Sequence, residues 1–244
     1  LGGGSVIDSS KAIGYGVKYD GDVWDIYARK YVPTEMLPVG VILTIPAAGS
    51  EMSDSSVITK EDGDLKIGYS NNICRPKFAI MNPVRTFTLP PYQTACGATD
   101  IMMHTMERYF GKVDDMTLID NIAEALMRTV KDSVFHVLEN PEDYRNRACI
   151  MWASSLGHND LTGDRSYADF ATHQIEHELS AMFDGAHGAG LAAVWPSWAR
   201  YVMDENVSRF ARFAVNVMGV PNDFTDTKAT AMAGVEAVEK FYRA

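Results

Sequence analysis

The sequence predicts an α/β part followed by an all-helical part. Short apolar runs rich in β-branched residues lie before Thr88, and such runs are typical of strands. Pro90 and Pro91 then interrupt the chain, and from Ala95 onward the apolar residues recur at helical spacing. We therefore divide the 244 residues into an α/β part, 1–88, and a helical part, 89–244.

The chain opens with the glycine-rich stretch Leu1-Gly-Gly-Gly-Ser5. Val6 and Ile13 are seven positions apart and share one helical face, which puts the glycines at the start of a helix. Backbone N–H groups at such an N-terminus form an anion site suited to a pyrophosphate. The pattern is not G-x-G-x-x-G, and an expression linker is the alternative interpretation of GGGS.

Four strands are expected in the α/β part, at residues 39–44, 53–59, 66–69 and 78–83. Thr44, Ser50 and Ser53 would place hydroxyl groups along one loop edge, and Lys66 would bring a positive charge to it. Ordinary turn chemistry or a solvated lysine explains each of these residues individually.

Seven helices are expected in the second part, at residues 95–110, 117–138, 141–158, 167–184, 187–203, 206–218 and 226–243. Several carry stripes of methionine and aromatic residues. We interpret these stripes as packing surfaces rather than cofactor contacts.

Three of the six histidines lie within 15 residues. His173 and His177 are at i and i+4, so on a helix both imidazoles leave the same face. His187 follows after a turn and could fold back toward them. Gly188 and Gly190 beside it are small enough for another backbone or a ligand to approach closely.

A second cluster lies upstream, where Asp100 and His104 are again at i and i+4 on a methionine-rich segment. A carboxylate among apolar residues needs a partner, because an isolated buried charge is expensive. Mixed imidazole and carboxylate ligands suit a divalent metal such as iron or zinc. We take Asp100, His104, His173 and His187 as the ligands, so His177 is not assigned to the metal.

The alternative for any one histidine is a hydrogen-bonded core residue, and we interpret His136 and His158 in that way. For the cluster itself the competing interpretation is a zinc metallopeptidase. Residues 173–177 match H-x-x-E-H, in which both histidines would bind zinc and Glu176 would activate water. That interpretation leaves Asp100 and His104 without a role.

The composition, 46% hydrophobic and 22% charged, is that of a globular protein. A net charge of −10 argues against nucleic acid or an anionic membrane surface as partner. Cys74, Cys96 and Cys149 are far apart and are expected to be free thiols. No apolar run is long enough to span a bilayer and no signal peptide opens the chain, so a cytoplasmic location is the default expectation.

With these motifs in place, the chain resembles the iron-containing (group III) alcohol dehydrogenases, in particular their NAD(P)H-dependent butanol dehydrogenase branch. The segments that carry the resemblance include GGGSVIDSSKAIG, IPAAGSEMSDSSVIT, TLPPYQTACGATDIMMHTMERYF and ATHQIEHELSAMFDGAHGAGLAAVWPSWARYV. The resemblance implies a partial Rossmann-like dinucleotide-binding part followed by a helical metal-binding domain, as in the dehydroquinate synthase-like fold. It also implies a homodimer, and a chain that corresponds to only part of a longer enzyme.

The resemblance further implies hydride transfer between NAD or NADP and a primary alcohol or aldehyde such as butanol or butyraldehyde. The family's metal ligands, for Fe²⁺ or Zn²⁺, fall on Asp100, His104, His173 and His187, and its additional active-site histidine falls on His177. The positions expected to contact the cofactor are Gly3, Gly4, Ser5, Asp8, Thr44, Ser53, Lys66 and Leu89.

Overall fold

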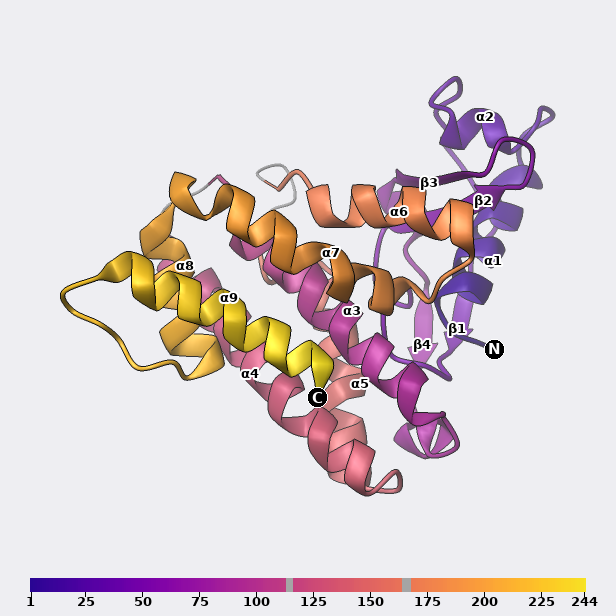
Figure 1. The fold of residues 1–244 in the computed structure, drawn as a ribbon. Coiled ribbons are helices and arrows are strands. Elements are labelled where there is room, and N and C mark those ends of the chain that lie inside the picture. Colours follow the sequence, from indigo (N-terminus) through magenta and orange to yellow (C-terminus); the bar gives the residue numbers. More distant parts are fainter. Residues whose placement is uncertain (113–115, 164–167) are drawn as a thin grey trace.

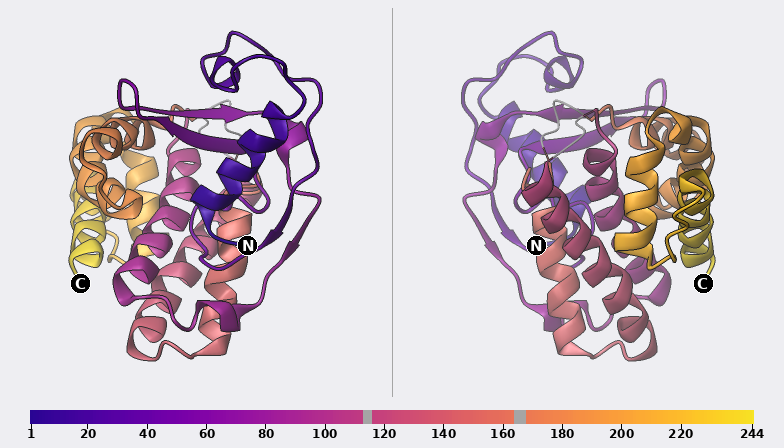
Figure 2. Two further views of the ribbon diagram at one scale, coloured as in Figure 1. Left: turned by 90° about the vertical axis from the view of Figure 1, so that its right-hand side faces the viewer. Right: turned by 90° about the vertical axis from the view of Figure 1, so that its left-hand side faces the viewer.

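The structure is a computed structural model that describes residues 1–112, 116–163 and 168–244. The strands gather at one end of the molecule, on the right in Figure 1, and the long helices occupy the rest. The two side views in Figure 2 show the N-terminal part lying against one side of the helices. This arrangement agrees with the expected order of an α/β part and a helical part.

The N-terminal part contains a short β-α-β unit. Strand β1 (Gly40–Ile42) pairs in parallel with β4 (Phe78–Ile80), and a parallel bridge joins Gly2 to Leu43. Helix α1 (Gly4–Gly16) connects Gly2 to β1 and begins directly after the glycines, as expected. Parallel pairing needs such a crossover helix, and here it brings the N-terminus of α1 to the edge of the sheet.

A β-hairpin forms the second sheet. Strands β2 (Ser55–Lys60) and β3 (Leu65–Ser70) pair antiparallel around the turn at residues 61–64 that the sequence predicts. The short elements of this part are α2 (Trp24–Tyr27), η1 (Asn72–Cys74) and η2 (Pro83–Thr86).

The helical part consists of α3 (Pro91–Tyr109), α4 (Thr117–Glu139), α5 (Tyr144–Gly157), α6 (Ala171–Phe183), α7 (His187–Val202), η4 (Met203–Glu205), α8 (Val207–Phe213), the π-helical turn η5 (Ala214–Met218) and α9 (Thr227–Arg243). Helix α3 begins four residues earlier than expected, because a proline is well tolerated in the first turn, where its missing N–H would have no helical partner. The expected start of α6 at residue 167 lies outside the described residues. Within the described ranges, no helix is both long and apolar enough to cross a membrane.

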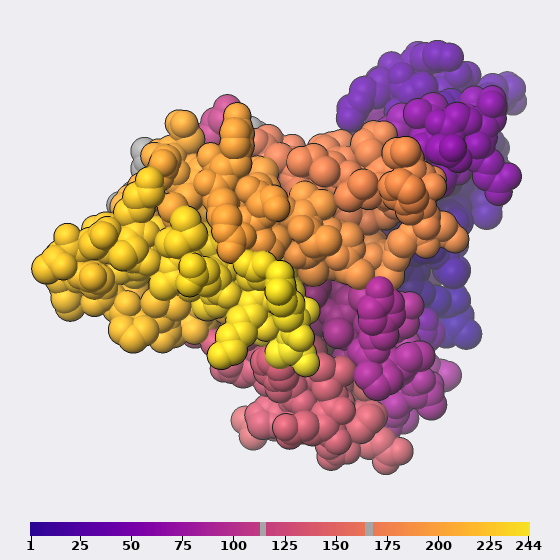
Figure 3. Space-filling view, in the orientation of Figure 1, coloured from indigo at the N-terminus to yellow at the C-terminus, as the bar shows by residue number. Residues whose placement is uncertain are grey.

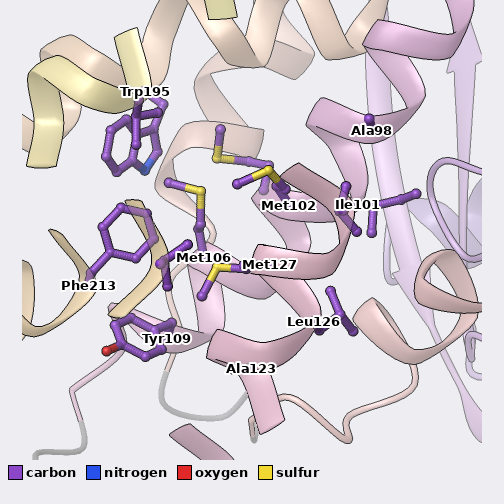
Figure 4. Close-up of a cluster of buried hydrophobic side chains, with 14 of the residues drawn as sticks. Ala98, Ile101, Met102, Met106, Tyr109, Ala123, Leu126, Met127, Trp195 and Phe213 are labelled. Carbon is purple, nitrogen blue, oxygen red and sulfur yellow. The ribbon is translucent and has the colours of Figure 1, made fainter. Parts of the chain in front are cut away.

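The main core lies between α3, α4, α7, α8 and α9, and Figure 4 shows its centre. Met102, Met106 and Met127 meet there, with Trp195 and Phe213 beside them, and each is at most 1% exposed. The methionine stripe on α3 is therefore a packing surface, as the sequence predicts. His136 is different: it lies on the exposed side of α4, so its interpretation as a core histidine is wrong.

A smaller apolar cluster joins the two parts, because Met151 of α5 packs with Ile7, Val41 and Leu43. Helix α6 lies directly against the N-terminal part, next to β3, as the space-filling view also shows (Figure 3). The switch from strands to helices falls where it was expected, whereas the division into domains at 88/89 stays a prediction.

Candidate metal centre

Three helices bring the predicted ligands together. Helix α3 carries Asp100 and His104 on one face, α6 carries His173 in its first turn, and α7 begins at His187. Asp100, His104 and His173 are 3%, 7% and 4% exposed. The i, i+4 spacing puts Asp100 and His104 on one face of α3, and the packing of α7 on α3 and of α6 on α7 brings the histidines of those helices to the same buried point.

That point is one oxygen of Asp100. Its Oδ1 lies 3.3 Å from His104 Nε2, 3.6 Å from His173 Nε2 and 3.7 Å from His187 Nε2. Asp100 Oδ1 and His173 Nε2 are buried and have no hydrogen-bond partner among the described residues. Buried polar atoms are rarely left without a partner, and one carboxylate with three imidazoles is a donor set that iron and zinc accept. The residues therefore fit a divalent metal.

The ligand atoms of Asp100, His104 and His173 all lie within 4.8 Å of one another. Glu176, His177 and His187 form a second such group, so His187, 3.7 Å from Asp100 Oδ1, lies between the two. Glu176 contacts His187 Nδ1 and Ser180 Oγ, and Lys66 Nζ lies 3.5 Å from its Oε2. Its negative charge is thus already matched by a lysine, which disfavours a second cation there.

These contacts also argue against the metallopeptidase alternative. A peptidase of the H-x-x-E-H type needs its glutamate free to take a proton from water. Glu176 is instead 1% exposed and is held by His187, Ser180 and Lys66.

Glu107 is a buried neighbour of the site that the sequence analysis missed. It lies on α3, seven residues after Asp100 and three after His104, so all three share one helical face. Its Oε1 accepts hydrogen bonds from the backbone N of His173 at 2.9 Å and from His173 Nδ1 at 3.0 Å. A third acidic or imidazole side chain on a buried face is the signal that would have pointed to it.

The pKa values reflect burial and this concentration of charge. Burial alone would lower the pKa of His173, but the Asp100 and Glu107 carboxylates raise it to about 9. Burial would likewise raise the pKa of Glu176, but its contacts with His187 and Ser180 and the charge of Lys66 lower it to about 2. Burial, helped by Lys66 and the neighbouring imidazoles, lowers the pKa of His177 to about 3.

A cavity of about 930 Å³ connects this centre with the N-terminus of α1. The predicted site residues that line it are Gly4, Ser5, Asp8, Lys66, Asp100, His104, His173, His177 and His187. Gly3, Thr44, Ser53 and Leu89 are not part of its lining. His158 lines it too, and its Nε2 hydrogen-bonds Ser55 Oγ at 2.9 Å.

Ser53 has a different environment from the one expected of a cofactor contact. It is 1% exposed, and both its carbonyl oxygen and its hydroxyl accept from the Lys11 ammonium, at 3.1 and 3.3 Å. Lys11 is fully buried and also lies 4.0 Å from Asp8 Oδ1. These contacts tie α1 to the start of the β2–β3 hairpin beside the cavity.

The two glycines beside His187 allow the close approach that the sequence predicts. A Cβ on Gly188 would lie 2.1 Å from the backbone oxygen of Cys96, and a Cβ on Gly190 would lie 2.8 Å from the Glu176 side chain. Gly188 thus lets α7 contact the backbone of α3, and Gly190 makes room for Glu176 next to His187.

Comparison with known proteins identifies the family. The sequence model "Iron-containing alcohol dehydrogenase" matches residues 1–83, and the model "Fe-containing alcohol dehydrogenase family, C-terminal" matches residues 94–244. The chain is 39% identical over 242 residues to the "Probable NADH-dependent butanol dehydrogenase 2" of Bacillus subtilis, covering 99% of this chain and 62% of that protein. It is 43% identical over 221 residues to NADH-dependent butanol dehydrogenase A of Clostridium acetobutylicum, covering 90% of this chain and 57% of that protein.

A solved structure has the same fold. The crystal structure of NADH-dependent butanol dehydrogenase A from Thermotoga maritima superposes with a TM-score of 0.94 at 38% identity, covering 99% of this chain and 60% of that one. The chain thus spans about 60% of the length of the relatives it matches. With both family models matching and a donor set that fits a divalent metal, this chain belongs to the iron-containing alcohol dehydrogenase family.

Proposed function

We propose that this protein transfers a hydride between NAD(P)(H) and a primary alcohol or aldehyde such as butanol or butyraldehyde. The convergence of three histidine Nε2 atoms on Asp100 Oδ1, in the wall of a cavity that reaches the N-terminus of α1, carries the proposal. Relatives named NADH-dependent butanol dehydrogenases support it. Because the chain spans about 60% of their length, the activity of the whole protein is inferred from them.

Asp100, His104, His173 and His187 would hold the metal, iron or zinc. When bound, the metal supplies Lewis-acid polarisation of the substrate oxygen. One carboxylate and three neutral imidazoles would leave a net positive charge at the site, which favours an anionic oxygen. Buried walls on α3 and α6 would keep bulk water away from it.

The cofactor, NAD or NADP, would lie along the cavity. The helix start at Gly3, Gly4 and Ser5 offers backbone N–H groups to a pyrophosphate, and Asp8 lies one turn further on. Lys66 would add a positive charge near the nicotinamide half. Thr44, Ser53 and Leu89 lie outside the lining of the cavity, and the buried Ser53 is hydrogen-bonded to Lys11, so we do not include these three residues among the proposed contacts.

His177 would act on the proton released with the hydride. Its lowered pKa keeps the imidazole neutral near pH 7 and disfavours the imidazolium form, so the ring would pass a proton on by accepting at one nitrogen while it releases the proton of the other. It lines the cavity between His173 and His187, with ring centroids 6.4 and 5.6 Å away. We infer from this position that His177 relays the proton or orients the nicotinamide.

Three further parts of the proposal rest on the sequence or, for the homodimer, on the family resemblance alone. These are the division into domains at 88/89, a homodimer and a cytoplasmic location. The cysteines, Cys74, Cys96 and Cys149, are all free, which is compatible with a reducing compartment.

The deciding experiment measures the metal content of the purified chain together with butyraldehyde-dependent oxidation of NADH and NADPH. We expect about one divalent metal per chain, lost in Asp100→Ala. Asp132→Ala is the matched control, because Asp132 is exposed on α4. Full metal occupancy without Asp100, together with casein cleavage, would contradict the proposal and favour the peptidase.

A further inference from the structure

Helix α6, which carries His173, has one local capping bond at its start, in which Asp169 Oδ1 accepts from the backbone N–H of Ala171 at 2.9 Å. Its N-cap residue, Phe170, has left-handed backbone angles (φ 53°, ψ 36°) and makes no side-chain capping bond. The first N–H groups of a helix have no partner within the helix and need acceptors from elsewhere. Left-handed angles are also unfavourable for an aromatic residue. The Asp169 bond satisfies only the N–H of Ala171, so the N–H of His173 needs an acceptor from elsewhere.

Glu107, on another helix, supplies the acceptor for His173. One oxygen, Oε1, accepts both the backbone N–H of His173, at 2.9 Å, and its Nδ1–H, at 3.0 Å. Glu107 and His173 are each 4% exposed, so the two hydrogen bonds are sheltered from water. A negative charge at a helix N-terminus is favourable in itself.

The hydrogen bond at Nδ1 also determines which ring nitrogen of His173 is available to a metal. Because Nδ1–H is donated to Glu107, Nε2 is the ring nitrogen left for a metal, and it lies 3.6 Å from Asp100 Oδ1. A metal that binds there takes the place of the Nε2 proton. Carboxylates that hold the outer nitrogen of a ligand histidine fix its tautomer and orientation.

We propose that Glu107 is a positioning residue for the metal: a single carboxylate oxygen holds the first turn of α6 at His173 and fixes the tautomer and direction of the His173 imidazole. The same face of α3 then carries two metal ligands, Asp100 and His104, and the anchor of a third. This inference rests on the proposed metal centre.

Glu176 stands in a similar relation to His187, since it contacts that residue's Nδ1. Its carboxylate is shared with Ser180 and Lys66, however, so a substitution there would disturb three contacts at once. Within the described residues, both hydrogen bonds of Glu107 go to His173. Glu107 therefore gives the cleaner test.

The test compares the dissociation constants for Zn²⁺ and Co²⁺ of the wild-type chain, Glu107→Gln and Glu107→Ala, measured by competition with a chelator. A glutamine keeps the shape and an acceptor oxygen but not the charge, so we expect the constant to rise about 10-fold; for alanine we expect about 100-fold. Glu124→Gln is the matched control, because Glu124 is 3% exposed and bonds Tyr109 and Arg212 instead. Its constant should stay within about twofold of wild type.

The Co²⁺ absorption bands provide a readout that a purely structural role would not move. They should change in position and intensity for both Glu107 variants and stay unchanged for Glu124→Gln. If Glu107→Ala does not fold, Glu107→Gln decides: wild-type affinity and bands in that variant would overturn the inference. A wild-type chain that binds neither metal would instead refute the proposed metal centre on which the inference depends.

Discussion

At the scale of single residues, a His177 variant distinguishes metal binding from catalytic turnover. It lines the cavity but is not among the four proposed ligands, and burial holds its pKa at about 3. If it is an acid–base group, His177→Ala should lower turnover by roughly 10²–10⁴ with the metal retained. Steady-state kinetics and metal content, measured on one preparation, check both halves of this expectation.

His136→Ala serves as the control, because His136 is exposed on α4. Unchanged turnover in His177→Ala would remove this histidine from the mechanism. Loss of metal in the same variant would instead assign it to the ligand set.

Asp8 should make folding depend on pH. Burial raises its pKa from 3.8 to about 6, even though the charge of Lys11 and the hydrogen bond from the Val57 backbone act in the opposite direction. A native pKa above the unfolded value means that the native state holds the proton more tightly. The contribution of Asp8 to the free energy of unfolding is therefore greatest below pH 4 and declines as the pH rises to about 6, by about 3 kcal/mol in all.

Asp8→Asn cannot titrate and isolates this contribution. The difference in unfolding free energy, wild type minus Asp8→Asn, should fall between pH 4.5 and 6.5 in urea titrations and then level off. A difference that stays constant over this range, or grows, would contradict the buried, protonatable carboxyl.

Sequence spacing predicted the four proposed ligands but not the residues, such as Glu107, whose hydrogen bonds orient them. Asp100 and His104, like His173 and His177, are close in the chain, so the i, i+4 rule brings them to one face. Glu107 acts on His173 across 66 residues of sequence. Such a contact depends on how α6 docks on α3, which local periodicity does not encode.

At the scale of elements, the helices were predicted better than the strands. A helix satisfies its hydrogen bonds within itself, so the apolar periodicity of α4 or α9 is sufficient evidence. Strand β1 has three residues where six were expected, because a strand extends only as far as its neighbours pair with it.

The contact between α7 and α3 should be intolerant of added volume. Gly188→Ala would place a methyl group 2.1 Å from the Cys96 backbone oxygen, so one of the helices must move. We expect a loss of about 1–3 kcal/mol in unfolding free energy, and weaker metal binding because His187 adjoins the shift.

Gly185→Ala is the internal comparison, since no atom lies within 4 Å of a Cβ built there. Its urea unfolding midpoint should match that of wild type. Equal midpoints for both variants would mean that α7 and α3 do not approach as closely as the structure has them.

At the scale of the whole molecule, the α/β part and the helical part make more contacts with each other than the sequence indicates. The change from strands to helices suggested two units, because element type can be read locally. The cluster of Met151 with Ile7, Val41 and Leu43 is non-local, and so are the hydrogen bonds from Ser154 and Ser155 to the buried Glu51. Helix α5 therefore belongs to both parts.

This shared cluster predicts that the parts unfold together. Met151 is 2% exposed, and Met151→Ala should cost about 2–5 kcal/mol. Because its contacts lie on β1 and α1 while its helix packs on α3 and α4, the loss should lower the opening free energies of peptides from both parts equally. Hydrogen exchange with mass spectrometry measures this, and Trp152→Ala, at an adjacent residue that is 53% exposed, should leave both values near wild type. A loss of protection confined to the strands would show instead that residues 1–88 open as an independent unit.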